Sequence, residues 1–372
     1  MNKIRICHFS TVHIRADVRI FHKECTSLAE AGYEVHLAVA DGKGNAVVKG
    51  IRIHDIGKIS NRIARIIFSP IMIFFKVLSL RCVVYHFHDP ELLFVGLFLK
   101  LLTKAKVIYD AHECYSEYFL HKEYLPEAVR PLFSAVIKAV ERCTAGRFDQ
   151  VITTTEYQAA KLKGINPRLD IIYNYPLLSE WNFSNQLPEA GKQRAICYIG
   201  SISEERGISQ VIKAIENIDC VFHLAGSYAI PSYRNEIMKL SGWSKVVEHG
   251  YVNREQAAGI ISKSLIGIVL LLPKPNHLIS HSTKIFEYMA GGIACLVPDF
   301  PIWKDIVEKH ECGLCVDPND IALIAKTLEQ MLDNPDLMRE MGQIGKQLVQ
   351  STYNWESQIP ALLNIYRTAL MN

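Results

Sequence analysis

The stretch IRICHFSTVHIRADVRIFHKECTSLAEAGYEVHLAVA (residues 4–40) decides the fold. An apolar run opens it and another closes it, and between them apolar residues recur at intervals of three and four: Val18, Phe21, Cys25 and Leu28. This spacing predicts a helix with one buried face, ended by Gly32, between two strands. The order strand, helix, strand predicts a mostly parallel sheet covered on both faces.

The same alternation continues along the chain. Strands are predicted at 4–10, 34–40, 51–56, 82–88, 106–112, 150–155 and 170–174, and after a break at 195–200, 220–225, 246–252, 265–272 and 293–297. The break, 179–194, is rich in Asn, Ser, Pro and Gly, and we interpret it as a linker. The fold class is therefore α/β with two doubly wound, Rossmann-like domains at 1–180 and 195–350, and a final helix within 351–372 is expected to pack back on the first domain.

Composition excludes several classes of protein. The 372 residues are 49% hydrophobic and 21% charged, which is typical of a packed globular chain. A net charge of +3 is too small for a nucleic-acid footprint, so no nucleic-acid partner is expected. The opening MNKIRICHFS has no apolar signal segment, and the ten cysteines are spread along the chain, so we expect a cytoplasmic protein with reduced, buried thiols. Cys312 and Cys315 form the one Cys-x-x-Cys, with no second pair to complete a zinc site.

Many polar residues follow directly on predicted strands, including His8, His86, His88, His112, Gly200 and Ser201. In open α/β sheets ligands bind outside the carboxyl ends of the strands. Two such edges that faced each other would form one cleft between the domains. The alternative is that these residues bind no ligand and are polar only because residues in surface loops are generally polar.

Several nucleotide-binding motifs are missing. The chain has no Gly-x-x-x-x-Gly-Lys-Ser/Thr, no Gly-x-Gly-x-x-Gly after the first strand, and no Asp-x-Asp pair to hold a metal-bound diphosphate. Any diphosphate must therefore be held by fixed cations and helix ends, and no metal or other cofactor is expected.

The stretch LPKPNHLISHSTKIFEYMAGGIACLVPD (residues 272–299) supplies such groups. A polar loop ending in Ser282 precedes a predicted helix, whose free N–H groups can bind an anion. Lys284 lies in the first turn, where a cation opposes the helix dipole but can hold phosphate; the alternative is a solvated lysine. Glu287, one turn further on, could pair with Lys284 or accept hydrogen bonds from ribose hydroxyls.

PNHLISHSTKIFEYMAGGIACLVPDFPIW (residues 275–303) resembles the donor-site segment of the retaining glycosyltransferases of family 4, which have the GT-B fold and include enzymes of bacterial polysaccharide biosynthesis such as capsule or O-antigen assembly. The resemblance extends along essentially the whole chain, with further similar segments at residues 16–37, 86–93 (HFHDPELL), 109–113 (YDAHE) and 198–215. It implies a glycosyltransferase, of hexosyl or N-acetylhexosaminyl groups, that retains the anomeric configuration.

The resemblance also implies roles for single residues. The second domain would bind a nucleotide-sugar, UDP-sugar in preference to GDP-sugar, through Gly200, Ser201, Arg206, Ser282, Lys284 and Glu287. Arg206 and Lys284 would hold the diphosphate, and Glu287 the ribose. The first domain would bind a saccharide or lipid-linked acceptor, with His112 at the reaction centre and His88 and Glu113 on the acceptor side.

The chain departs from the family pattern at three places. Ile279 stands where the family has an acid, Gly200-Ser201 where many members have Gly-Arg, and residues 10–13 where a glycine pair is common. These differences leave the sugar open. Two alternatives stay open: a nucleotide-sugar epimerase, which can share this two-domain architecture, and a non-catalytic GT-B subunit, which the missing acid at Ile279 leaves open.

Two further features bear on the acceptor. Residues 58–81 (KISNRIARIIFSPIMIFFKVLSLR) mix five cations with an uncharged run of ten residues, 66–75, which is too short to span a bilayer. A peripheral contact with the inner face of the cell membrane is one interpretation, and packing against the sheet is the other. Arg19 and Lys23, four residues apart, are expected to be solvated or to meet an acceptor phosphate.

Overall fold

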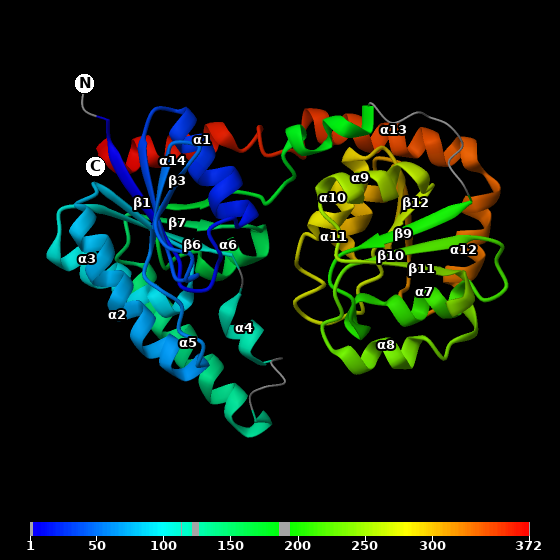
Figure 1. The fold of residues 1–372 in the computed structure, drawn as a ribbon, viewed down its shortest axis with the longest axis horizontal. Helices are drawn as coiled ribbons and strands as arrows, with labels where there is room; N and C mark the ends of the chain where they lie inside the picture. Colours follow the sequence, from blue (N-terminus) through cyan, green and yellow to red (C-terminus); the bar gives the residue numbers. More distant parts are fainter. Residues whose placement is uncertain (1–2, 113, 121–125, 186–193, 372) are drawn as a thin grey trace. The chain divides into compact units, whose positions relative to one another are not determined.

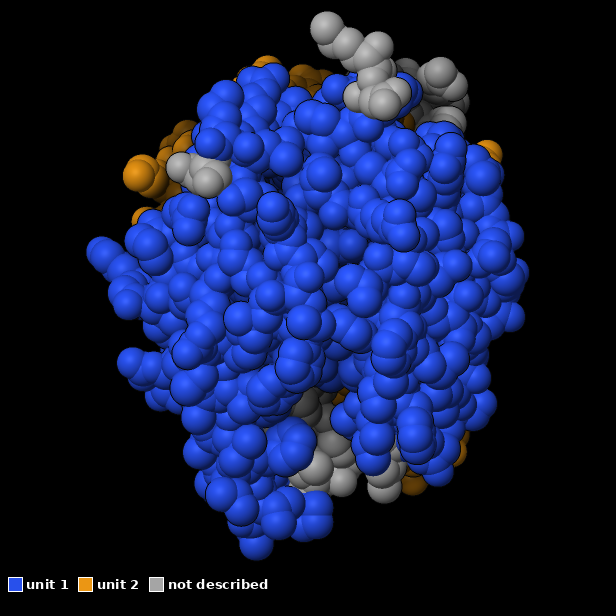
Figure 2. Space-filling model, turned by 90° about the vertical axis from the view of Figure 1, so that its left-hand side faces the viewer, with its two compact units in different colours: residues 1–174, 358–372 blue, residues 175–357 orange. Residues whose placement is uncertain are grey.

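The computed structural model describes residues 3–112, 114–120, 126–185 and 194–371. The chain forms two compact units: unit 1 comprises residues 1–174 and 358–372, and unit 2 comprises residues 175–357. Figure 2 colours unit 1 blue and unit 2 orange. Each unit is an α/β structure with its own sheet.

The sheet of unit 1 has the strand order β3-β4-β2-β1-β5-β6-β7-β8 among the described residues, and every pairing is parallel except β3 with β4. The strands are β1 (Arg5–Phe9), β2 (Glu34–Val39), β3 (Ala46–Val48), β4 (Ile51–Asp55), β5 (Val84–Phe87), β6 (Lys106–Ala111), β7 (Gln150–Thr153) and β8 (Leu169–Ile171).

The helices of unit 1 lie on both faces of this sheet (Figure 1). In chain order they are the π-helix η1 (Val18–Cys25), α1 (Thr26–Glu30), α2 (Arg62–Leu80), η2 (Pro90–Leu92), α3 (Leu93–Leu102), α4 (Tyr115–Leu120), η3 (Glu127–Val129), α5 (Arg130–Ala145), α6 (Glu156–Leu162) and α14 (Ile359–Met371). The side chain of Asp17 accepts a hydrogen bond from Ile20 N and so begins η1, and Gly32, with φ +96°, follows α1.

The two faces of the unit 1 sheet differ in character because side chains alternate along a strand. Cys7 and Phe9 of β1 point into an apolar core with Phe87, Tyr109 and residues of α2 and α3. His8, on the other face, contacts Tyr366 of α14. One face is therefore an ordinary hydrophobic core, and the opposite face carries buried polar side chains.

The sheet of unit 2 has the order β11-β10-β9-β12-β13-β14, all parallel. Its strands are β9 (Ala195–Ile199), β10 (Val221–Ala225), β11 (Val246–Gly250), β12 (Ile266–Ile268), β13 (Ala294–Pro298) and β14 (Gly313–Val316). Its helices are η4 (Leu178–Asn185), η5 (Glu204–Arg206), α7 (Ile208–Ala214), α8 (Pro231–Ile237), η6 (Ser241–Lys245), α9 (Arg254–Lys263), α10 (Thr283–Ala290), α11 (Pro301–Trp303), η7 (Lys304–Glu308), α12 (Ile321–Asp333) and α13 (Pro335–Ser351).

The predicted α/β class and every predicted strand are confirmed, with ends that shift by a few residues. The chain crosses between the units near residue 174, upstream of the stretch 179–194 interpreted as a linker. Leu178 N donates to the Glu356 carboxylate and Trp355 N donates to Pro176 O, so this segment is held on unit 2. Residues 178–185 form η4, and 186–193 lie outside the described residues.

All ten cysteines are free thiols, as expected, and seven of them are buried. Among the described residues no helix is both long enough and apolar enough to cross a membrane. Within the segment 58–81, Arg62–Leu80 form α2, a 19-residue helix that contains Pro70. Ile73 and Val77 pack into the core, whereas other apolar side chains of the helix are exposed: Ile66, Ile67, Phe68, Ile71, Met72 and Phe75.

Candidate functional site

The loop after β9 makes room for a lysine from a distant helix. Gly200 has φ +149°, and a Cβ on it would lie 2.0 Å from Cε of Lys284. A Cβ on Gly226, after the neighbouring strand β10, would lie 1.8 Å from the carbonyl oxygen of Gly200. Glycine is therefore required at both strand ends for the loop and the lysine side chain to pack this closely.

Lys284 lies in the first turn of α10, with its Nζ 5.9 Å from the ring centroid of Tyr198. Burial and the nearby positive charge of Arg206 lower the pKa of the Lys284 ammonium to about 8. Among the described residues, no carboxylate lies within ion-pair distance of Lys284. Its positive charge is therefore available to an anion.

Arg206 ends the short helix η5 and is partly buried. The next residue, Gly207, is left-handed with φ +70°, and a Cβ there would lie 2.0 Å from the carbonyl oxygen of Leu270. The tight turn thus directs Arg206 to the same region as Lys284, where the charge of Arg206 lowers the pKa of the Lys284 ammonium. Ser282 is the N-cap of α10, and its side chain makes no capping hydrogen bond. The N-terminus of α10 and two cations together form an anion-binding arrangement.

Glu287 pairs with Arg254, which no sequence motif had indicated as a site residue. Its Oε1 accepts a 2.7 Å hydrogen bond from Arg254 at the start of α9, and Arg254 also lies 3.5 Å from Glu180. The suggested ion pair between Glu287 and Lys284 is therefore not formed. Asn253 and Gln256, which form the capping box of α9, were the sequence signal that a helix begins at this arginine.

Ser201 is exposed and takes part in the site through its backbone. Its carbonyl oxygen accepts a 2.7 Å hydrogen bond from the Tyr198 hydroxyl. Tyr198 therefore fixes the start of the loop while its ring lies below the Lys284 ammonium. The structure thus brings Gly200, Ser201, Arg206, Ser282 and Lys284 together, with Glu287 one turn further along α10.

In unit 1, His112 directly follows β6, and 13% of its side chain is exposed. Its Nε2 lies 3.0 Å from Asp110 Oδ2 and 3.1 Å from His88 Nδ1. Its backbone carbonyl accepts hydrogen bonds from Thr154 Oγ1 and Gln158 Nε2. The imidazole is therefore fixed by a buried carboxylate on one side, and part of the ring remains open to solvent.

Arg19 lies inside the unit, contrary to both expectations for it. It is 4% exposed, and its guanidinium donates to both oxygens of Asp110 and to Ile172 O. Burial opposes ionisation of Asp110, but Arg19 and His112 lower the pKa of its carboxyl group well below the usual range. Arg19 therefore neutralises the carboxylate that orients His112 and does not present its charge to an acceptor phosphate.

His88 is also fully buried, which corrects its expected place on the acceptor side. Its ring stacks on His86 at a centroid distance of 4.6 Å and lies behind His112. Glu113, the other acceptor-side candidate, lies outside the described residues. The sequence correctly placed His88 at the end of a strand, but the burial of its ring depends on side chains from other strands, which the sequence does not reveal.

The turn at residues 10–13 binds a carboxylate of the protein itself. Asp89 Oδ2 accepts hydrogen bonds from Ser10 Oγ at 2.8 Å, Thr11 N at 2.6 Å and Val12 N at 3.2 Å. These backbone donors are consequently engaged with Asp89, and the anion site of unit 2 has no counterpart at this turn.

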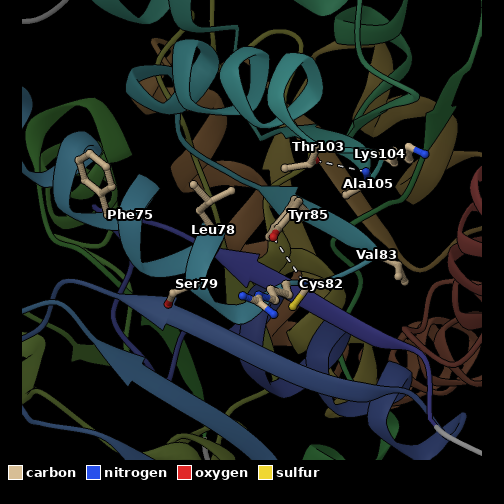
Figure 3. A pocket seen from close by; sticks show the side chains of 10 residues that line it. Phe75, Leu78, Ser79, Cys82, Val83, Tyr85, Thr103, Lys104 and Ala105 are labelled. Atoms are coloured by element: carbon tan, nitrogen blue, oxygen red, sulfur yellow. Dashed lines mark hydrogen bonds between the residues drawn. The ribbon is translucent and has the colours of Figure 1, made fainter.

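A hollow of about 620 Å³ opens at the amino-terminal ends of the strands in the unit 1 sheet (Figure 3). Phe75 and Leu78 of α2 line it, with Val83 and Thr103 from the loops that precede β5 and β6. Its lining is mainly apolar, and it lies at the opposite end of the strands from His112. It is therefore separate from the candidate catalytic groups.

The two Rossmann-like units, each with a mostly parallel sheet, match the GT-B fold of solved glycosyltransferase structures. The model of glycosyl transferases group 1 matches residues 179–348, and the model of glycosyltransferase family 4 matches residues 18–175. The chain belongs to these glycosyltransferases, and the predicted family and enzyme class are confirmed.

Individual relatives agree with this assignment. The chain is 21% identical over 301 residues to an uncharacterized glycosyltransferase of Methanocaldococcus jannaschii, covering 77% of this chain and 75% of the relative. The fold of this chain is similar to that of sucrose-phosphate synthase from Thermosynechococcus elongatus (TM-score 0.80, 18% identity), with 99% of this chain and 100% of that chain covered. It is also similar to HepE of Anabaena, solved in complex with UDP-glucose (TM-score 0.73, 12% identity, 98% and 100% covered).

Proposed function

We propose that this glycosyltransferase transfers a sugar from a UDP-sugar to a saccharide or lipid-linked saccharide, with retention of configuration and with no metal ion at the diphosphate. The observation that carries the proposal is the pair of cations, Arg206 and Lys284, at the N-terminus of α10. The UDP-glucose bound to HepE supports the choice of base. Polysaccharide assembly as the setting is supported by the similarity to WaaG, a glycosyltransferase of lipopolysaccharide biosynthesis.

Charge development during transfer explains why fixed cations suit this reaction. Breaking the bond from the anomeric carbon to the phosphate leaves negative charge on the diphosphate. Arg206, Lys284 and the N–H groups of α10 would stabilise that charge without rearrangement. The leaving phosphate itself would accept the proton of the acceptor hydroxyl, which gives front-face transfer without a covalent enzyme intermediate.

His112 would orient the transferred sugar through hydrogen bonds. Its fixed imidazole, with Asp110 and His88 behind it, has the rigidity that positioning requires. Glu287 would accept hydrogen bonds from the ribose, because its pairing with Arg254 leaves its other carboxylate oxygen for a ligand.

The exposed surface of α2 would contact the membrane that carries a lipid-linked acceptor. Phe75 is 65% exposed, and Ile67, Phe68 and Ile71 are also exposed on this helix. Arg81, the residue that follows α2, lines the hollow at the amino-terminal edge of the sheet. Apolar side chains next to cations are suited to an anionic lipid surface. Vesicles containing anionic lipid should bind the protein, and Ile71→Ser with Phe75→Ser should weaken that binding.

The first experiment is a thermal-shift panel of UDP-, GDP- and ADP-sugars, followed by transfer assays of Arg206→Ala and Lys284→Ala. Each variant should lose transfer by about 10²-fold or more, because each removes a charge at the leaving group. Lys274→Ala is the matched control, since Lys274 lies near the same loop but pairs with Glu205 at the surface. Full turnover in both site variants would contradict the diphosphate assignment.

Incubating the same protein preparation with the donor, with and without an acceptor, distinguishes a transferase from an epimerase and from a non-catalytic subunit. An epimerase would release nucleotide from the donor alone, whereas a transferase requires an acceptor. A non-catalytic subunit would show neither reaction, with or without acceptor.

A further inference from the structure

Four side chains converge on the polar face of the unit 1 sheet, and the proposed transfer reaction gives no direct role to three of them. His8 belongs to β1, His86 to β5, His88 follows β5, and Glu24 comes from η1. All four side chains are 0% exposed. His8 and His86 are direct neighbours across the β1–β5 pairing, and His88 lies two residues further on the same face.

The distances within this cluster match a metal coordination shell. His8 Nδ1 and His88 Nε2 are 3.1 Å apart, and Glu24 Oε2 lies 3.7 Å from the first and 3.9 Å from the second. The point in their plane that is equidistant from these three atoms lies about 2.1 Å from each, which is the length of a zinc bond to nitrogen or oxygen. One ligand atom from each of the four residues lies within 4.8 Å of all the others.

Three buried atoms of the cluster have no hydrogen-bond partner among the described residues: Glu24 Oε1, Glu24 Oε2 and His86 Nε2. Glu24 Oε2 accepts no hydrogen bond, because both imidazole nitrogens are beyond hydrogen-bond distance, and His86 Nε2 is also unpartnered. Glu24 Oε1 forms an ion pair with Arg19 Nε at 3.1 Å but accepts no hydrogen bond from it. An unsatisfied carboxylate oxygen and an unsatisfied imidazole nitrogen in a sealed interior indicate a missing partner.

The outer nitrogens of the same rings are held from behind. His8 Nε2 and His86 Nδ1 each lie 2.8 Å from the hydroxyl of Tyr366 on α14. His88 Nδ1 lies 3.5 Å from Asp110 Oδ2. Metal-binding histidines are usually oriented by such a contact on the nitrogen that does not bind the metal.

We propose that His8 Nδ1, Glu24 Oε2, His86 Nε2 and His88 Nε2 bind one divalent transition-metal ion, zinc in the first instance. Three imidazoles and one carboxylate are ligands that zinc accepts in a four-coordinate site. The four ligands would join β1, β5 and η1, so the ion would stabilise unit 1. Because all four are buried, the ion is sealed from substrate, and the inference does not depend on the proposed transfer reaction.

The test uses the full chain, purified without a metal-affinity column or chelator. Elemental analysis should find about one zinc per chain, and X-ray absorption should show a shell of nitrogen and oxygen only, at about 2.0–2.1 Å. A sulfur-containing shell would place the ion on cysteines and overturn the proposal. Absence of metal, together with no uptake of Zn²⁺ or Co²⁺ by the chelator-treated protein, would also overturn it.

Variants identify the ligands. Glu24→Gln and His86→Gln should each reduce the zinc content at least about tenfold, in line with loss of one ligand. His54→Gln is the matched control, since His54 also forms a histidine pair in unit 1, with Nε2 2.8 Å from His36 Nδ1. Equal zinc content in all three variants would contradict the assignment. If the ligand variants do not fold, the absorption spectrum of the native protein decides the question.

Discussion

Lys284 is a residue whose position favours binding over stability. A cation in the first helical turn opposes the dipole of α10, and burial with Arg206 lowers its pKa to about 8. Gly200 leaves the space in which its stem lies. The protein therefore maintains a partly desolvated ammonium group that an anion would stabilise.

The affinity for UDP should consequently depend on pH near the pKa of Lys284. In the free protein the ammonium is protonated below about pH 8 and becomes neutral above it. Because the diphosphate binds the protonated form, affinity should fall by up to about tenfold per pH unit above this pH. Calorimetry between about pH 6.5 and 9.5 measures this. Lys284→Met should bind weakly with no such inflection, and an unchanged inflection in that variant would assign it to another group.

Gly200 offers a steric test of the same site. A methyl group on Gly200 would overlap Lys284 Cε, so Gly200→Ala should displace the lysine and weaken UDP binding about tenfold or more. Gly250→Ala is the control, because Gly250 also has a positive φ, +64°, but nothing lies within 4 Å of its added Cβ. Both variants carry backbone strain, so equal losses of affinity would show that strain and not displacement of Lys284 is responsible.

Among the elements, α14 stands out because it is last in the chain yet completes the core of unit 1. Tyr366→Phe should destabilise the protein by about 1–3 kcal/mol, since it removes the hydroxyl from His8 Nε2 and His86 Nδ1 in a buried site. Urea unfolding compares it with Tyr33→Phe, whose ring packs against Tyr366 at 5.8 Å. Equal destabilisation of the two variants would indicate that the hydroxyl is unimportant.

The sequence predicted the elements well where periodicity was strong. Two strands, β3 and β14, were not predicted from the sequence. β3 has three residues at an edge, two of them exposed, and β14 has only four residues beginning with Gly313, so neither shows a usable alternation. In 58–81 the short uncharged run excluded a membrane span, but the helix α2 and the exposure of its apolar residues are known only from the structure.

The candidate site was predictable to the extent that it follows strand ends and helix starts. Gly200, Arg206 and Lys284 come together because the loops after parallel strands share one edge. The partners of Arg19 and Glu287 could not be predicted, because Asp110 and Arg254 are distant in sequence and no local pattern links them. Burial of a charged group depends on all its neighbours at once.

On the scale of the whole molecule, transfer should need no added metal. The proposed diphosphate site has two fixed cations, and the four side chains of the buried cluster in unit 1 are not exposed. Brief treatment with excess EDTA should therefore leave the transfer rate within about twofold of its starting value, since cations and helix dipole supply the charge. Metal content is measured before and after. The expectation of metal-independent transfer would be contradicted if EDTA abolished activity, magnesium or manganese restored it, and the metal content of unit 1 stayed unchanged.

The sequence of unit 2 is inserted into that of unit 1, between residues 174 and 358. A ribosome therefore finishes all of unit 2 before it makes Tyr366, the hydroxyl partner of His8 and His86. Protein domains generally fold as units in the order in which they are synthesised. Here the N-terminal unit begins first and is completed last, so a nascent chain passes through a stage in which the polar face of its first sheet lacks its final helix.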